Sequence, residues 1–139
     1  MKTSRRRARE FALQGLYQWQ LAGTDPATIA RQLGDAKGFD KIDAAYFKAL
    51  LEGAVAAAPE LERSLAPHLD REYSRLSPVE RAILLLAGYE LAHQPEVPYR
   101  AVINEAVELA KEYGGTDGYK YVNGVLDKLA ARLRAAEQK

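Results

Sequence analysis

The chain has 139 residues, of which 28% are charged and 47% are hydrophobic, and its formal net charge is +1. This length and composition fit one soluble globular domain, which we expect to span residues 1–139. Cysteine is absent, which excludes disulfides and thiolate metal sites. No apolar run approaches the roughly 20 residues that a membrane-spanning helix needs. Because Gln14, Gln18 and Gln20 interrupt the apolar segment behind the basic start, we expect a mature cytoplasmic protein and no signal peptide.

Nearly the whole chain has the pattern of α-helices separated by proline and glycine, with no alternating strand pattern. Asp25 before Pro26 and Ser77 before Pro78 have the pattern of helix N-caps. Residues 83–87 are apolar on every side, which predicts a helix at the centre of the fold. We interpret residues 34–40 as a loop between two sub-bundles. The fold class is therefore predicted as all-α, a compact bundle of about seven helices, with helices over residues 4–21, 26–34, 41–58, 59–69, 77–94, 98–114 and 117–134.

No catalytic or metal-binding pattern stands out in this sequence. His68 and His93 lie far apart and lack HExxH spacing, so we interpret them as surface or capping histidines. No serine occupies a GxSxG elbow. Gly114 and Gly115 follow a helix rather than a strand, which indicates helix C-caps and not a dinucleotide-binding loop. We predict a protein that is not an enzyme and that uses no metal and no cofactor.

Positive charge is concentrated at the start of the chain. The first ten residues, MKTSRRRARE, hold five basic side chains and one acidic one, a net charge of +4, so the rest of the chain sums to −3. Arginines of this kind supply phosphate contacts in nucleic-acid-binding proteins. The alternative is a disordered, solvated tail. The continuation of Arg9 and Glu10 into helical periodicity argues against a tail alone.

A helical wheel of residues 4–21 places Tyr17 on the outer face. Either another helix covers this tyrosine, or its ring is a stacking platform for an RNA base beside the arginines. The wheel alone favours neither. The inner face is expected to hold Ala8, Phe11, Ala12, Gly15, Leu16 and Trp19, and the outer face Arg6, Glu10, Leu13 and Tyr17.

The last predicted helix has a similar arrangement. Its inward stripe is Val122, Leu126, Leu129 and Leu133, with Val125 at the edge and Tyr119 expected in the core. Lys120 and Tyr121 lie off this stripe in the first turn, where free N–H groups and the helix dipole favour phosphate. Gly124 costs about 1 kcal/mol relative to alanine, and such a glycine often marks the close approach of a backbone or a ligand. The alternative for Tyr121 is a solvated tyrosine on a charged face.

Three segments of the chain resemble the NusB family of bacterial transcription antitermination factors. They are RRRAREFALQGLYQWQL, SPVERAILLLAGYEL and VPYRAVINEAVELAKEYGGTDGYKYVNGVLDKLA, so the resemblance covers nearly the whole chain. It implies an all-helical fold of two small bundles sharing a central helix. It also implies binding of boxA RNA together with NusE, a small-subunit ribosomal protein, and action with other Nus factors on RNA polymerase, notably in ribosomal RNA transcription.

The resemblance also assigns residues to these tasks. Asp117 would repel phosphate unless it caps the helix or accepts from a base. Tyr121 stands where relatives often have phenylalanine, which preserves stacking. Glu80 is implied to lie near the NusE surface and is also the carboxylate of a capping box. The residues implied in RNA contact are Arg5, Arg6, Arg7, Arg9, Tyr17, Asp117, Lys120 and Tyr121.

Two alternatives remain open at this point. A NusB-like domain also precedes the catalytic domain of some ribosomal RNA methyltransferases, but the chain has no glycine-rich strand–helix unit and ends at Lys139, which favours the free-standing factor. A helical protein–protein adaptor would use its arginines for solubility only. RNA binding with a steep salt dependence would exclude such an adaptor. The sequence does not distinguish a monomer from a homodimer.

Overall fold

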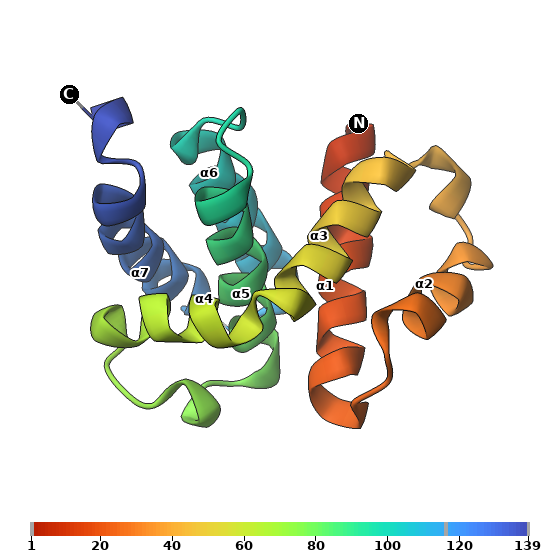
Figure 1. Cartoon of the computed structure of the whole chain (residues 1–139), viewed down its shortest axis with the longest axis horizontal. Coiled ribbons are helices and arrows are strands. Elements are labelled where there is room, and N and C mark those ends of the chain that lie inside the picture. Colours follow the sequence, from red (N-terminus) through yellow and green to blue (C-terminus); the bar gives the residue numbers. More distant parts are fainter. Residues whose placement is uncertain (1, 116, 139) are drawn as a thin grey trace.

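The described part of the chain folds into seven α-helices and four short 3₁₀ turns (Figure 1). The computed structural model describes residues 2–115 and 117–138, and over these residues it contains no strand, which confirms the all-α prediction. None of the described helices is long and apolar enough to cross a membrane. The helices are α1 (Ser4–Ala22), α2 (Pro26–Gly34), α3 (Ala44–Ala56), α4 (Ala58–Leu65), α5 (Pro78–His93), α6 (Tyr99–Tyr113) and α7 (Gly118–Leu133), and the turns are η1 (Phe39–Lys41), η2 (Ala66–His68), η3 (Tyr73–Arg75) and η4 (Ala135–Gln138).

Side-chain caps set the starts of several helices where the sequence predicted them. The Asp25 carboxylate accepts from the backbone N–H groups of the first turn of α2 at 3.1 and 3.2 Å. The Ser77 hydroxyl accepts from the N–H of Glu80 at 3.2 Å. The third helix begins later than predicted, at Ala44 instead of residue 41, because Asp43 caps it by accepting from the N–H of Tyr46 at 3.1 Å.

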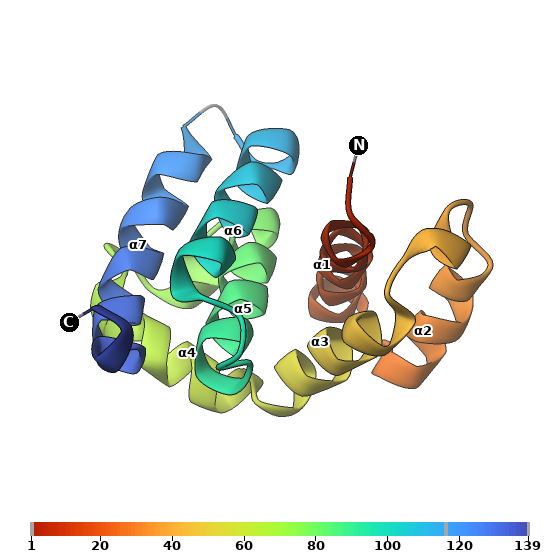
Figure 2. The same cartoon turned by 90° about the horizontal axis from the view of Figure 1, so that it is seen from above.

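The helices form two sub-bundles that share α5 (Figure 2). One consists of α1, α2 and α3, and the other of α4, α6 and α7, and α5 contacts helices of both. Every residue from Ala82 to Gly88 is buried, as expected for the central helix. Trp19 and Tyr119, which were predicted to be core residues, pack against the core but are only partly buried.

The interpretation of residues 34–40 as a loop between sub-bundles is wrong. This segment leads into η1, which closes the α1–α3 sub-bundle. The ring of Phe39 packs edge-on between Phe11 and Phe47, with centroids 5.3 and 5.2 Å away. The chain instead passes from the first sub-bundle to the second at Ala57, which ends α3 and begins α4.

Gly53 explains how α3 comes close to α5. A Cβ atom built on Gly53 would lie 2.3 Å from Cζ of Tyr89, too close for both groups to stay in place. The Tyr89 ring in turn stacks on His93 with centroids 5.1 Å apart. A glycine in the middle of a helix is thus required here by packing within the chain.

Candidate nucleic-acid interface

The arginine run belongs to the first turns of α1 and is not a tail. Thr3 caps the helix, with its hydroxyl accepting from the N–H of Arg6 at 3.0 Å. Arg5, Arg6 and Arg7 therefore stand in the first turn, which contains no acidic residue. The helix dipole disfavours cations at this end. Side chains that oppose a local preference in this way are typical of functional sites, where an anion outside the chain provides the compensation.

Arg9 is a buried structural residue. Its side chain is 7% exposed, and its Nε and Nη2 donate to the carboxylate of Glu90 at 2.9–3.1 Å. Glu90 also accepts from the hydroxyl of Tyr46 at 2.5 Å, and burial raises the pKa of this hydroxyl above its usual range. Since its guanidinium is directed inward, we expect Arg9 to support the neighbouring arginines and not to contact RNA, in contrast to the prediction from the resemblance.

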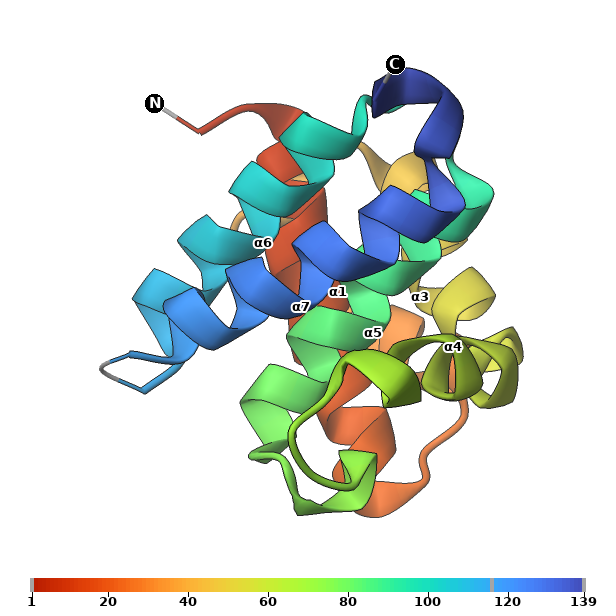
Figure 3. The ribbon, with the colours of Figure 1, turned by 90° about the vertical axis from the view of Figure 1, so that its left-hand side faces the viewer.

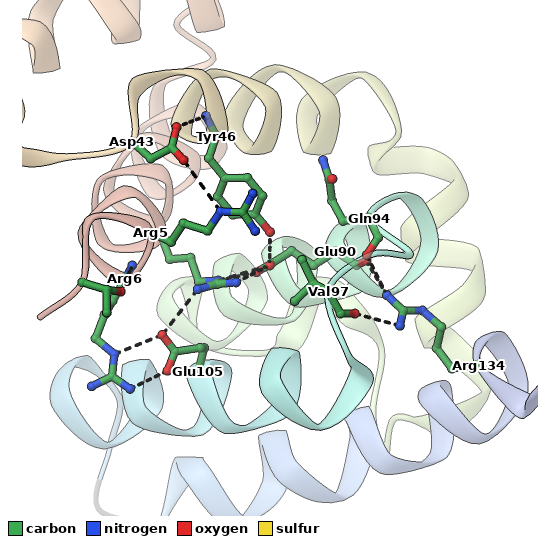
Figure 4. Close-up of polar contacts among 11 residues, drawn as sticks. Arg5, Arg6, Asp43, Tyr46, Glu90, Gln94, Val97, Glu105 and Arg134 are labelled. Atoms are coloured by element: carbon green, nitrogen blue, oxygen red, sulfur yellow. Dashed lines mark hydrogen bonds and ion pairs between the residues drawn. The ribbon is translucent and has the colours of Figure 1, made fainter. Parts of the chain in front are cut away.

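Glu105 on α6 joins this buried cluster to the surface (Figure 4). It accepts from Nη1 of Arg9 at 3.4 Å and from Nε of Arg6 at 3.0 Å, and a second bond comes from Nη2 of Arg6. The hydrogen bonds from Arg6 hold the pKa of the Glu105 carboxyl below its usual value. The Arg6 side chain remains 41% exposed, so Glu105 fixes its position while leaving part of the guanidinium accessible.

The other two arginines of the run lie at the surface. The guanidinium of Arg5 stacks on the Tyr46 ring, 4.2 Å from its centroid, and its Nε lies 3.7 Å from a carboxylate oxygen of Asp43. Among the residues that the structure describes, Arg7 has no carboxylate within ion-pair distance. Arg5, Arg6 and Arg7 thus present a cationic edge whose orientation is set by Tyr46 and Glu105.

The pairing of Arg6 with Glu105 predicts a pH dependence of stability. A carboxylate whose pKa is lowered by folding stabilises the folded state above its ordinary pKa, and the contribution is lost as the pH falls through the lower folded value. Glu105→Gln is therefore expected to be less stable than the parent protein near pH 7, and the difference should shrink below about pH 4.5. Thermal melts of both proteins from pH 7 to pH 3 measure this. A constant difference would show that the carboxylate charge does not stabilise the fold.

Tyr17 stands at the rim of an apolar cavity of about 400 Å³ between α1, α5 and α6. Its side chain is 38% exposed, and Val79 and Tyr113 line the same cavity. Leu13, which the wheel placed on the outer face, is only 6% exposed, because α5 packs on this side of α1. Helix α1 is thus covered on two sides, yet Tyr17 remains accessible. The exposed Tyr113 is a neighbour that sequence reasoning missed.

The start of α7 brings Asp117, Lys120 and Tyr121 together. Asp117 precedes the helix without a side-chain capping bond and lies 3.6 Å from Nζ of Lys120. Tyr121 is partly buried against the core, and its hydroxyl accepts from the N–H of Asp70 at 3.2 Å. Arg71 lies over the ring, 5.5 Å from its centroid. Neither alternative for Tyr121 describes it fully, since one edge packs on protein while the side chain remains partly exposed.

Glu80, at the start of α5, lies between the Tyr17 cavity and the start of α7. Its backbone N–H donates to the Ser77 hydroxyl, which is one half of the predicted capping box. Among the described hydrogen bonds the reciprocal bond from the Ser77 N–H to the Glu80 carboxylate is absent, because this carboxylate extends towards α7. A Cβ built on Gly118 would lie 3.4 Å from Oε1 of Glu80. Since Val79 borders the Tyr17 cavity, the surface runs from Tyr17 on α1 through the start of α5 to the start of α7.

Comparison with known proteins identifies the family to which this chain is similar. A family model described as the NusB family matches residues 6–131. The chain is 60% identical over 136 residues to the transcription antitermination protein NusB of Ralstonia nicotianae, covering 98% of this chain and 88% of that protein. It is 64% identical over 129 residues to the protein of the same name from Nitrosospira multiformis, covering 93% and 82%. The chain belongs to the NusB family.

Solved NusB structures share the fold. T. maritima NusB superimposes with a TM-score of 0.83 at 31% identity, over 94% of this chain and 92% of that one. A crystal structure of the antitermination factors NusB and NusE in complex with dsRNA gives a TM-score of 0.81 at 30% identity, over 91% and 96% of the two chains. NusB membership confirms the prediction of a transcription antitermination protein from a family that is not enzymatic.

Proposed function

We propose that this NusB-family protein binds single-stranded boxA RNA together with NusE and acts with the other Nus factors on RNA polymerase, notably in ribosomal RNA transcription. Residues 1–139 would act as one domain, because α1, α5 and α7 all contribute to the surface. Transcription in bacteria takes place in the cytoplasm, and we place its action there. The observation that carries the proposal is the cationic first turn of α1, where Arg5, Arg6 and Arg7 stand against the helix dipole.

The proposed RNA contacts divide by chemistry. Arg5, Arg6 and Arg7 would supply phosphate contacts, and Lys120 would add one at the start of α7. The rings of Tyr17 and Tyr121 are accessible in part and would stack on bases. Asp117, paired with Lys120 at 3.6 Å, would accept a hydrogen bond from a base rather than face phosphate.

The proposed NusE surface lies beside the RNA contacts. Tyr17, Leu21 and Tyr113 are the exposed large hydrophobic side chains of the described residues. Clustered exposed apolar groups are typical of protein interfaces. Glu80 stands next to Val79 of the cavity wall, and a carboxylate at the edge of an apolar patch suits a basic partner. We propose that NusE covers this cavity with Glu80 at the rim.

Titration of labelled boxA RNA with and without NusE tests the proposal as a whole. The chain alone offers few base contacts, so we expect weak binding alone and tighter binding with NusE. Equal affinities in the two titrations would contradict the cooperative part. No binding in either titration would favour the protein–protein adaptor.

Removing Arg6 and Arg7, which are both partly exposed, should weaken RNA binding without unfolding the protein. For the double variant Arg6→Ala, Arg7→Ala we expect the slope of log affinity against log salt to flatten by about 0.7 for each lost phosphate contact. The control is Lys37→Ala, Lys41→Ala, which removes two positive charges from the exposed turn before α3. An unchanged slope in the arginine variant, or an equal change in the control, would show that these arginines do not touch phosphate.

A further inference from the structure

A groove of about 300 Å³ lies between α7 and the segment that follows α4. Figure 3 shows α7 crossing the front of the molecule above this segment. His68 and Asp70 line one wall, and Tyr121, Gly124 and Lys128 line the other. Of the residues assigned to RNA above, Lys120 and Tyr121 line one end of this groove.

Gly124 has no packing role within the chain. A Cβ built on Gly124 meets no atom within 4 Å, whereas the equivalent atom on Gly53 would collide with Tyr89. After proline, glycine is the least favourable residue in a helix interior. The open space above Gly124 therefore admits a molecule from outside the chain, at the floor of the groove.

The groove is cationic along its length. Lys120, Gly124, Lys128 and Arg132 follow each other at intervals of four and so form one ridge of α7, about 18 Å long at 1.5 Å per residue. Lys128 and Arg132 are exposed, and within the described residues neither lies in an ion pair. Among nearby carboxylates, Asp70 is held by Arg71 at 2.7 Å and Asp117 by Lys120 at 3.6 Å, while Asp127 lies on a neighbouring row of α7.

His68 adds an unsatisfied polar atom beside the groove. Its Nε2 is buried without a hydrogen-bond partner among the described residues. Burial, together with the charges of Arg132 and Lys128, lowers the pKa of this imidazole, so the ring is held neutral. A neutral imidazole offers a donor and an acceptor, which suits a base or ribose hydroxyl as a partner.

We propose that this groove extends the RNA path beyond Tyr121, with one nucleotide seated over Gly124 beside His68 and with phosphates along Lys128 and Arg132. The inference rests on the proposed RNA-binding function and adds a second stretch of contacts to it. Charge favours RNA over a protein here, because Lys128 and Arg132 lie in no ion pair among the described residues and the nearby carboxylates Asp70 and Asp117 are already paired. The adjacent Tyr121 ring provides continuity with the first stretch.

RNA length separates this stretch from the first one. A boxA RNA is compared with the same RNA extended by about six uridines at either end. The extension that runs along α7 should tighten binding by about tenfold and steepen the salt slope by about 1.4, for two added phosphates. In Lys128→Ala, Arg132→Ala this gain should disappear while affinity for the unextended RNA is kept. The control Arg31→Ala, Lys48→Ala removes the same charge from exposed positions on α2 and α3 and should keep the gain.

Filling the groove gives an independent measurement. Gly124→Leu should raise or keep the melting temperature, because leucine favours helix and meets open space. It should weaken binding of the extended RNA about fivefold or more by displacing the nucleotide. A melting temperature that is kept or raised, together with weaker RNA binding, would show that Gly124 lies in a ligand site. A lower melting temperature would instead indicate a packing defect.

The remaining outcomes overturn the inference in distinguishable ways. If extension adds nothing to the parent protein, or Gly124→Leu binds extended RNA normally, the groove is not an RNA site although the proposed function stands. If Gly124→Leu loses NusE and keeps RNA, the groove belongs to a protein partner. If the parent protein binds no RNA of either length, the proposed function and this inference fail together.

Discussion

Replacing Arg9 with alanine is expected to lower the free energy of unfolding by about 3–5 kcal/mol, the cost of breaking a buried ion pair by removing one partner. The carboxylate of Glu90 is 2% exposed and would be left with Tyr46 as its remaining hydrogen-bond donor among the described contacts. The loss would appear in urea unfolding followed by circular dichroism. The lost bonds are ones that join α1 to α5.

Two further variants isolate the cause. Arg7→Ala removes an arginine from the same helix that has no carboxylate partner among the described residues, and we expect its effect to stay within about 0.5 kcal/mol. Arg9→Met, Glu90→Met removes both charges and keeps apolar volume, so it should recover much of the lost stability. If Arg9→Ala were as stable as Arg7→Ala, the pair would not hold the helices together. RNA affinity per folded molecule should be kept in Arg9→Ala.

The helices were readable from the sequence because their signals are local. Asp25–Pro26 and Ser77–Pro78 place a capping side chain directly before a proline, and both caps form as predicted. The apolar residues 83–87 become the buried centre of α5. A cap acts over three residues and a helical stripe over one element, so neither depends on the rest of the fold.

The sequence did not show which arginines of the run are buried in the fold and which remain accessible. Arg6 and Arg9 are three residues apart on one helix, and each is basic. What separates them is Glu90, 81 positions from Arg9, which becomes the inner partner only when α5 packs against α1. A charge run shows that cations gather, but a distant carboxylate decides which of them is buried.

Similar reasoning applies to the aromatic residues of the surface. The helical wheel of α1 assumed that only one face of the helix is covered. It therefore predicted the same solvent-exposed environment for Leu13 and Tyr17. In the structure α5 packs on this side of α1, so that Leu13 is buried and Tyr17 remains at the rim of a cavity. Tyr113 joins them from the end of α6, where the sequence showed only an aromatic residue before two glycines. Two residues on the same face of a helix differ in burial when the neighbouring helix covers only part of that face.

Arg134 is the other residue whose role depends on distant partners. It was predicted only as the last residue of a helix. Its guanidinium is buried and donates to four backbone carbonyls at and beyond the end of α5, at Glu90, Leu91, Gln94 and Val97, over 2.7–3.1 Å (Figure 4). The carbonyls of Glu90 and Gln94 also accept backbone N–H bonds at 3.0 Å, whereas those of Leu91 and Val97 have Arg134 as their donor among the described hydrogen bonds. Arg134 thus caps α5 from a different part of the chain. The Glu137 carboxylate pairs with Nη1, the nitrogen that also donates to the carbonyl of Val97.

Arg134→Ala is therefore expected to lower the free energy of unfolding by about 2–4 kcal/mol, because it leaves the carbonyls of Leu91 and Val97 without a donor and a carbonyl left buried in this way costs about 1–3 kcal/mol. The stability of Arg134→Lys should lie between those of the parent protein and Arg134→Ala. A single ammonium group cannot reach all the carbonyls that the planar guanidinium reaches together. The matched control is Arg132→Ala, an exposed arginine two residues earlier, with an expected change within about 0.5 kcal/mol. Hydrogen exchange should locate the loss at the amides of the last turn of α5 and residues 94–97. Equal stability of Arg134→Ala and Arg132→Ala would mean that the α5 carbonyls are satisfied without this arginine.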